Sequence, residues 1–148
     1  MNVKQKKVII TSILILVVTA ALSVWYVFTV KFNDIKDEKV VYNVKALNLI
    51  KEFKNNDSMA NKKYAEKVMT VTGLVTEVES ADSSINIKLG DTLTGSYVIF
   101  AFQQQHINEV KNIKKGDSIS IKGSCSGGAY SEILETEFIT FKRCAIIK

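Results

Sequence analysis

A run of 23 residues without a charge constrains this chain more than any other feature of its sequence; it begins at Val8 and ends at Val30. As an α-helix rising about 1.5 Å per residue, the run would be about 34 Å long, enough to cross a hydrocarbon core of roughly 30 Å. Three aromatic residues, Trp25, Tyr26 and Phe28, lie near its C-terminal end, where such rings favour the membrane interface. We therefore expect a transmembrane anchor over residues 8–30.

The lysines before this run leave two interpretations open. Lys4, Lys6 and Lys7 followed by an apolar segment are also typical of a cleaved signal peptide, whose apolar core usually has about 7–15 residues. The run is longer than that, so an uncleaved anchor is the favoured interpretation. By the positive-inside rule the same lysines predict a cytoplasmic flank over residues 1–7 and place the rest of the chain outside the cytoplasm.

The net charge of the chain belongs mostly to this flank. The full sequence is formally +5, but from residue 31 onward 17 Lys and Arg face 15 Asp and Glu, which leaves +2. Non-specific binding to nucleic acid requires many cations on one face to neutralise phosphates. Nucleic acid is therefore disfavoured as a partner. Residues 31–41 mix both signs and predict a short stalk, and residues 42–148 predict one folded domain.

The folded domain opens with a helical extension. Behind Asn43, a good N-cap residue, apolar residues recur at near-helical spacing: Val44, Leu47, Leu49, Ile50 and Phe53. Residues 55–57 interrupt this helix, and Asp57 can cap a second short helix over residues 58–64. Its core-facing residues are expected to be Met59, Ala60 and Tyr64. We expect both helices to pack on the domain that follows; a spacer arm or a partner-binding helix is the alternative.

From residue 67 the apolar pattern changes to period 2, which predicts strands. Five segments show strand patterns, at residues 68–79, 85–89, 96–102, 118–125 and 138–147, with a helical pattern at 103–113. A five-stranded barrel with a helix between strands three and four is the OB-fold arrangement, and its closure hides the edges of short strands. The predicted fold class is therefore mainly β with helices: a five-stranded OB-fold barrel over about residues 67–148, preceded by N-terminal helices and a transmembrane helix. An open α+β sheet is the alternative.

The first of these strands changes parity around a glycine. Met69 and Val71 share one face before Gly73, whereas Leu74 and Val78 have the opposite parity after it. A bend or bulge at Gly73 would bring both sets into one curved sheet, as closure of a small barrel requires.

A series of short motifs runs through the same region. Its first part, Ala-x-x-Leu, Asn, Ala, Lys-Tyr, Lys-Val and Val-x-Gly, falls on Ala46, Leu49, Asn56, Ala60, Lys63, Tyr64, Lys67, Val68, Val71 and Gly73. Its second part, Gly-Asp, Gly-x-Cys-x-Gly and a late Cys, falls on Gly116, Asp117, Gly123, Cys125, Gly127 and Cys144. In order and spacing, residues 42–144 resemble the tRNA_anti-like family, small bacterial OB-fold proteins described as similar to the tRNA anticodon-binding domain. The resemblance implies a secreted or membrane-attached OB domain; it supplies no catalytic residues, and the family's description refers to fold similarity rather than to RNA binding.

The two cysteines fall in predicted strands that are neighbours in an OB barrel. Cys125 ends the fourth strand and Cys144 lies in the fifth. A compartment outside the cytoplasm permits a disulfide, which would contribute about 2–4 kcal/mol. By strand alternation, the side chain of Cys125 points to the buried face of its strand. That of Cys144 does so only if a bulge occurs near residues 142–143. We favour a Cys125–Cys144 disulfide, with two buried free thiols as the alternative.

Few side chains suggest chemistry. Tyr97 and Tyr130 are aromatic residues available to line a binding face, and they are the predicted binding residues. His106 has no neighbouring group to activate it and is expected to be a solvated helix residue. Three carboxylates precede the last strand, and without the spacing of a calcium loop they predict a solvated acidic loop: Glu132, Glu135 and Glu137. The sequence predicts no catalytic residue, no metal site and no cofactor.

These observations favour a non-catalytic, membrane-anchored OB-fold binding module exposed outside the cytoplasm. We expect its partner to be a peptide, a glycan or an envelope protein, bound by the barrel face and loops. The alternative is a module that binds single-stranded nucleic acid, which would need aromatic stacking platforms and a basic groove. Surface charge and exposed aromatic residues on the face of strands two and three distinguish these two classes.

Overall fold

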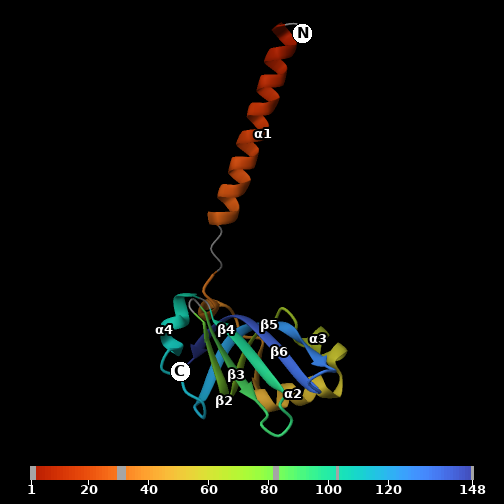
Figure 1. Cartoon of the computed structure of the whole chain (residues 1–148), viewed down its shortest axis with the longest axis vertical. Helices are drawn as coiled ribbons and strands as arrows, with labels where there is room; N and C mark the ends of the chain where they lie inside the picture. The colour runs from red at the N-terminus through yellow and green to blue at the C-terminus, as the bar shows by residue number, and fades with distance from the viewer. Residues whose placement is uncertain (1–2, 30–32, 82–83, 103, 148) are drawn as a thin grey trace. The chain divides into compact units, whose positions relative to one another are not determined.

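The computed structural model of the chain describes residues 3–29, 33–81, 84–102 and 104–147, and it divides after Asn33 into a helix and a compact domain (Figure 1). The helix, α1, spans Val3–Thr29. Its apolar stretch, Ile9–Thr29, has 21 residues, is long enough to cross a membrane, and is fully exposed. This helix fits a single-pass anchor or a signal peptide. Val30, the last residue of the predicted span, lies outside the described residues.

Five strands of the domain close into a ring (Figure 1). They are β2 (Val68–Ala81), β3 (Ser84–Gly90), β4 (Tyr97–Phe102), β5 (Ser118–Ser131) and β6 (Thr136–Ile147). The strand order is β2-β3-β4-β6-β5, and β5 pairs back onto β2. Only the β4–β6 pairing within this ring is parallel. This is the order of an OB fold, so the predicted fold class, mainly β with preceding helices, is confirmed.

A sixth strand, β1 (Tyr42–Lys45), adds to the ring by pairing in parallel with the first half of β2. The predicted helix start behind Asn43 is therefore wrong. Tyr42 and Val44 alternate toward the core as strand residues do, and α2 (Ala46–Asn55) begins only after them, with no side-chain cap. The prediction was wrong because Val44 fits the helical spacing of the apolar residues that follow it, although it belongs to β1.

The two predicted helices pack on the barrel as expected. In α2 the buried residues are Ala46, Leu49, Ile50 and Phe53. The break that follows is also confirmed, but the side chain of Asn56, rather than Asp57, caps α3 (Asp57–Tyr64) by accepting the N–H of Met59 at 2.9 Å. Tyr64 is buried as predicted and its ring stacks 6.3 Å from that of Phe53, whereas Met59 is 68% exposed and does not face the core.

The change of parity in β2 lies two residues later than predicted. Leu74 is 61% exposed and Val75 is buried, so the strand keeps its phase through Gly73. The register shifts between Val75 and Glu77, where a bulge returns Val78 to the core side. Gly73 has a different reason to be small: a Cβ there would lie 3.0 Å from the Cβ of Ala46 in α2.

The segments around the last two strands also differ from prediction. The helix expected over residues 103–113 is reduced to a 3₁₀ turn, η2 (Gln104–His106), and one turn of helix, α4 (Ile107–Val110), while Gln103 lies outside the described residues. The fourth strand, predicted to end at Cys125, continues to Ser131 as β5. A bulge between Cys125 and Gly127, with Gly127 at φ +106°, lets the strand pass over α2 and α3.

The predicted stalk over residues 31–41 is wrong for its larger part. Residues 34–41, which we call the strap, lie on the barrel and include a 3₁₀ turn, η1 (Ile35–Asp37). Ile35 is fully buried against Val68 and Ala145, and the N–H of Val41 donates to the carbonyl of Val68 at 2.8 Å. A mixed-charge segment therefore docks through one buried apolar side chain, its backbone and ion pairs of its charged side chains. Residues 31–32 lie outside the described residues.

Candidate binding groove

A groove of about 640 Å³ lies where β2, β3 and β4 meet two turns of the barrel. One wall comes from these strands and carries Thr76, Glu77, Val78, Lys88, Gly90 and Tyr97. The other comes from the β3–β4 turn and the turn before β5, with Asp91, Thr92, Gly95, Ser96, Ile113, Lys114 and Lys115. The face of strands two and three of the OB barrel thus carries a concave surface with one partly exposed aromatic ring.

Tyr97 forms the aromatic part of the groove. Val98 and Phe100 point into the core, so the alternation of β4 turns Tyr97 outward. Its ring stacks on that of Phe138 in the neighbouring β6, with centroids 6.5 Å apart and planes inclined by 26°. Phe138 and the amine of Lys88, whose Nζ lies over the ring 4.9 Å from its centroid, hold the ring in place, and the part of the ring that stays accessible borders the groove.

Lys88 lies beside this ring and is held by two carboxylates. Its Nζ is 4.9 Å from the centroid of Tyr97, 2.5 Å from Glu79 and 3.0 Å from Glu77. The hydrogen bond to Glu79 raises the pKa of Lys88 and lowers the pKa of Glu79, so both remain charged at neutral pH. At this point one cation faces two carboxylates, so an anionic ligand would have to compete with both of them for Lys88.

The remaining groove carboxylate, Asp91, is engaged by its own turn. It accepts the N–H of Leu93 at 3.0 Å and the hydroxyl of Thr94 at 2.9 Å, and these bonds lower its pKa. The turn closes at Gly95, whose φ of +72° favours glycine. Opposite it, Lys114 and Lys115 extend from the turn before β5. The groove thus pairs an aromatic platform with hydrogen-bonding groups of both signs.

Tyr130, the second predicted binding residue, lies on another face. Tyr97 is level with Phe138 across β4–β6, and Phe138 is level with Ala129 across β5–β6. Tyr130 follows Ala129 in β5 and pairs with Glu137 of β6. Because side chains alternate along a strand, Tyr130 points to the opposite side of the sheet from Tyr97. It is half exposed, but the structure does not bring it together with Tyr97.

The two cysteines are buried free thiols, so the favoured disulfide is not formed. Cys125 is level with Phe141 of β6, three residues before Cys144. The bulge that burial of Cys144 requires is present: Arg143 has φ +54°, and the register shifts there against both neighbouring strands. It turns Cys144 into the core but leaves the two sulfurs diagonal to one another rather than opposite. Burial raises the pKa of the Cys125 thiol to about 11 and also raises that of Cys144.

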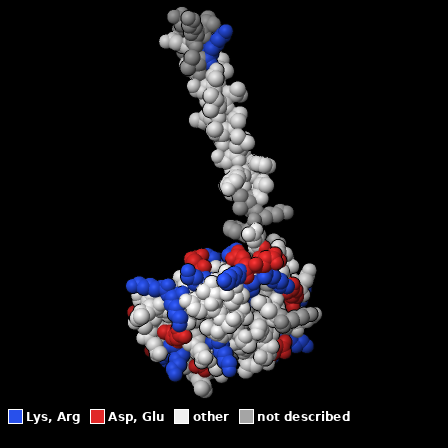
Figure 2. Space-filling model, turned by 180° about the vertical axis from the view of Figure 1, so that it is seen from behind, with Lys and Arg blue, Asp and Glu red and all other residues white. Residues whose placement is uncertain are grey.

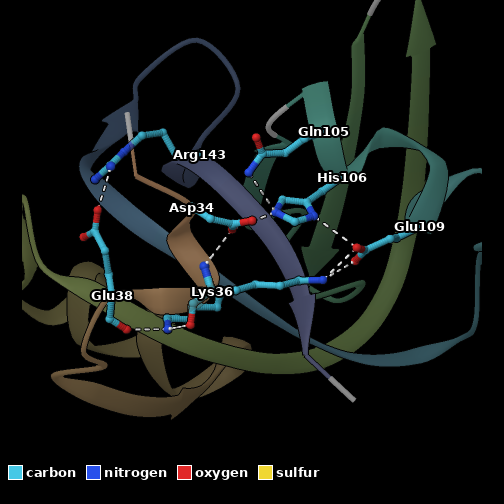
Figure 3. A network of polar contacts seen from close by, with 8 residues as sticks. Asp34, Lys36, Glu38, Gln105, His106, Glu109 and Arg143 are labelled. Atoms are coloured by element: carbon cyan, nitrogen blue, oxygen red, sulfur yellow. Dashed lines mark hydrogen bonds and ion pairs between the residues drawn. The ribbon is translucent and has the colours of Figure 1, made fainter. Parts of the chain in front are cut away.

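Sequence reasoning missed the environment of two ionisable residues. His106 is not solvated; its side chain is 7% exposed and lies between Asp34 and Glu109 (Figure 3). Glu137 does not belong to the acidic loop; it is buried in β6, its Oε1 has no hydrogen-bond partner, and burial raises its pKa. Glu132 and Glu135 do lie in the turn between β5 and β6. Among the described residues, no group of three His, Cys, Asp or Glu is placed to hold a metal.

The surface charge of the domain is mixed. On the face that Figure 2 shows, the basic and acidic side chains are interspersed. Several of the lysines pair with carboxylates, as Lys63 does with Glu52 at 2.9 Å and Lys142 with Glu66 at 3.0 Å. This distribution agrees with the small net charge of the sequence and offers little attraction to a run of phosphates.

Known proteins resemble the chain in sequence pattern and in fold. A sequence model described as tRNA_anti-like matches residues 1–136. A structure from Klebsiella pneumoniae, described as a candidate nucleic acid-binding lipoprotein, has a TM-score of 0.55 and 16% identity, over 71% of this chain and 91% of that chain. This likeness supports the OB-like fold.

Two other structures match less of the fold. An OBody bound to hen egg-white lysozyme gives a TM-score of 0.44 at 14% identity, over 58% of this chain and 86% of that chain. Asparaginyl-tRNA synthetase from Pyrococcus horikoshii gives 0.40 at 12% identity, over 58% of this chain and 21% of the synthetase. No curated protein matches the chain.

Proposed function

This chain belongs to the tRNA_anti-like family, and we propose that its OB domain is a non-catalytic binding module that α1 holds at a membrane. The helix has the length and composition for one membrane crossing, and the domain begins only a few residues after it. The lysines at positions 4, 6 and 7 favour a cytoplasmic N-terminus and a domain outside the cytoplasm.

The ligand that the groove fits best is a peptide or a glycan of the cell envelope. The observation that carries this proposal is the partly exposed Tyr97 ring, with Lys88 over it and two carboxylates on that lysine. A sugar ring or a flat side chain can pack against the accessible part of this ring while its polar groups bond to the neighbouring amine and carboxylates. Because Lys88 is already paired with carboxylates, the groove suits a polar ligand rather than a strongly anionic one.

A module for single-stranded nucleic acid is the second candidate. The description of the Klebsiella pneumoniae structure as nucleic acid-binding and the stacked pair Tyr97–Phe138 favour it. The net charge of +2 from residue 31 onward and the carboxylates on Lys88 oppose it, because affinity for single strands depends on phosphate neutralisation.

Binding assays with envelope fragments and with an oligonucleotide distinguish the two candidates, and replacing Tyr97 shows whether the groove is the binding site. We expect the full chain in mild detergent to bind envelope glycan fragments or peptides, and Tyr97→Ala to weaken that binding about tenfold. The matched control, Tyr130→Ala, removes a half-exposed tyrosine from the other face and should leave binding unchanged. Affinity for a labelled single-stranded oligonucleotide should be no tighter than about 10 µM near 150 mM salt, as fluorescence anisotropy can measure. Submicromolar, salt-sensitive oligonucleotide binding that Tyr97→Ala abolishes would instead establish the second candidate.

The proposed orientation has its own test. A reporter fused after Lys148 should behave as an exported protein, because the lysines in the first turns of α1 favour a cytoplasmic N-terminus. The chain should stay in the membrane fraction after washing at alkaline pH, as a spanning helix does. A reporter active in the cytoplasm would contradict the orientation, and release into the soluble fraction would favour cleavage of the helix as a signal peptide.

A further inference from the structure

The only histidine of the chain joins the strap to the barrel. His106 precedes α4, and both of its ring nitrogens face carboxylates: Nε2 is 2.8 Å from Oδ1 of Asp34, and Nδ1 is 3.0 Å from Oε1 of Glu109 (Figure 3). Asp34 is the first residue of the strap and lies 72 positions from the histidine. The imidazole is nearly inaccessible to solvent, so water does not replace these contacts readily.

The two contacts together specify a protonation state. An ionised carboxylate only accepts hydrogen bonds, and a neutral imidazole has one N–H to donate. Both contacts are satisfied at once only when the ring is a cation with two N–H donors. Hydrogen bonds lower the pKa values of Asp34 and Glu109, so both carboxylates stay ionised when the solution is near neutral.

The charged groups around the imidazole come from the strap and from α4. Besides Asp34 and Glu109, the Nζ of Lys36 lies 2.7 Å from Glu109 and links the two elements a second time. The side-chain amide nitrogen of Gln105 lies 3.4 Å from Nε2 of His106. On the other side of the strap, Lys122 of β5 donates to the carbonyls of residues 36 and 38, and Arg143 of β6 pairs with Glu38 (Figure 3).

We propose that His106 is a proton-dependent latch for the strap: its imidazolium holds residues 34–38 on the barrel, and loss of the ring proton loosens them. When the ring is neutral, one of its nitrogens becomes an acceptor that faces a carboxylate oxygen at 2.8–3.0 Å, a repulsive pairing of two acceptors. Lys122 and Arg143 also bind the strap, at residues 36 and 38, so loss of the ring proton loosens the strap without removing its remaining contacts. The latch stands independently of the ligand proposed for the groove.

Hydrogen exchange of the full chain in mild detergent tests the latch. The amides of residues 36, 37, 38 and 41 report on the strap, because they donate to Asp34, Ile35 and Val68. The amide of Val75, which donates to Asp117 in the barrel, is the internal reference. Between about pH 5.5 and pH 8, protection factors corrected for intrinsic exchange should fall about tenfold in the strap and stay constant at the reference.

Two variants separate the latch from a merely structural contact. In Glu109→Gln the new amide can donate to Nδ1 of a neutral ring, whose Nε2–H still serves Asp34, but the ion pair with Lys36 is lost. Strap protection should therefore be lower than in the wild type at pH 5.5 and equal at the two pH values. In His106→Gln the strap should be poorly protected at both. The control, Glu52→Gln, removes a carboxylate that pairs with Lys63 away from the strap, and it should keep the wild-type pattern.

Equal strap protection at the two pH values in the wild type would overturn the latch, and so would a pH dependence that survives in Glu109→Gln. If His106→Gln does not fold, the comparison of wild type with Glu109→Gln decides the question by itself.

Discussion

Gly128→Val should destabilise the domain by about 3 kcal/mol, at the upper end of what overpacking a core costs. A Cβ at this position would lie 2.7 Å from two ring carbons of Phe53 and 2.9 Å from Ile139. The Phe53 ring has no space to move into, because it is buried and stacks on the ring of Tyr64. Denaturant unfolding of the full chain in mild detergent measures the loss as a lower midpoint.

The adjacent Ala129 provides the control for this prediction. It is exposed and level with Phe138 on the outer face of the sheet, so Ala129→Val should change the free energy of unfolding by less than about 0.5 kcal/mol. Equal midpoints for Gly128→Val and the wild type would mean that α2 does not lie against β5 as described.

Phe53→Ala is expected to cost about 3–5 kcal/mol, because it removes a fully buried ring from between α2, α3 and the barrel. The same denaturant titration measures this loss. The double variant Phe53→Ala with Gly128→Val should be more stable than the sum of the two losses predicts, since the valine side chain occupies part of the space that the ring leaves. Simple additivity of the two single variants would contradict the contact between Phe53 and Gly128.

The barrel could be predicted from the sequence because each of its strands shows an apolar pattern within its own residues. Alternation in residues 85–89 and 118–121 and the apolar run ending at Phe102 are local patterns that tertiary contacts reinforce. The parity of Cys144 even indicated the bulge at residues 142–143. Where two patterns overlap, as at Val44, the sequence favoured the longer helix, and only pairing with β2 defines the four-residue strand.

The candidate site was only partly predictable, because its geometry depends on register. Tyr97 and Tyr130 have similar local sequences, but the bulge between Cys125 and Gly127 decides which face Tyr130 occupies. The burial of His106 depends on Asp34, a residue far away in the chain within what reads as a hydrophilic stalk. Neither the bulge before Gly127 nor a contact over that separation leaves a periodic trace in this sequence.

The docked strap determines how large a volume an anchored domain can sample. Five peptide units join Thr29, the end of α1, to Asp34, and thirteen join Thr29 to Tyr42, where β1 begins. At no more than about 3.6 Å per residue, the tether is limited to roughly 18 Å with the strap docked and roughly 47 Å with it fully released. The sampled volume grows with the cube of this length, so about eighteenfold is the largest fall in the local concentration of the domain around a fixed ligand that loosening the strap could cause. One proton on an imidazole would in this way change how often the groove encounters its ligand, with no change in the groove itself.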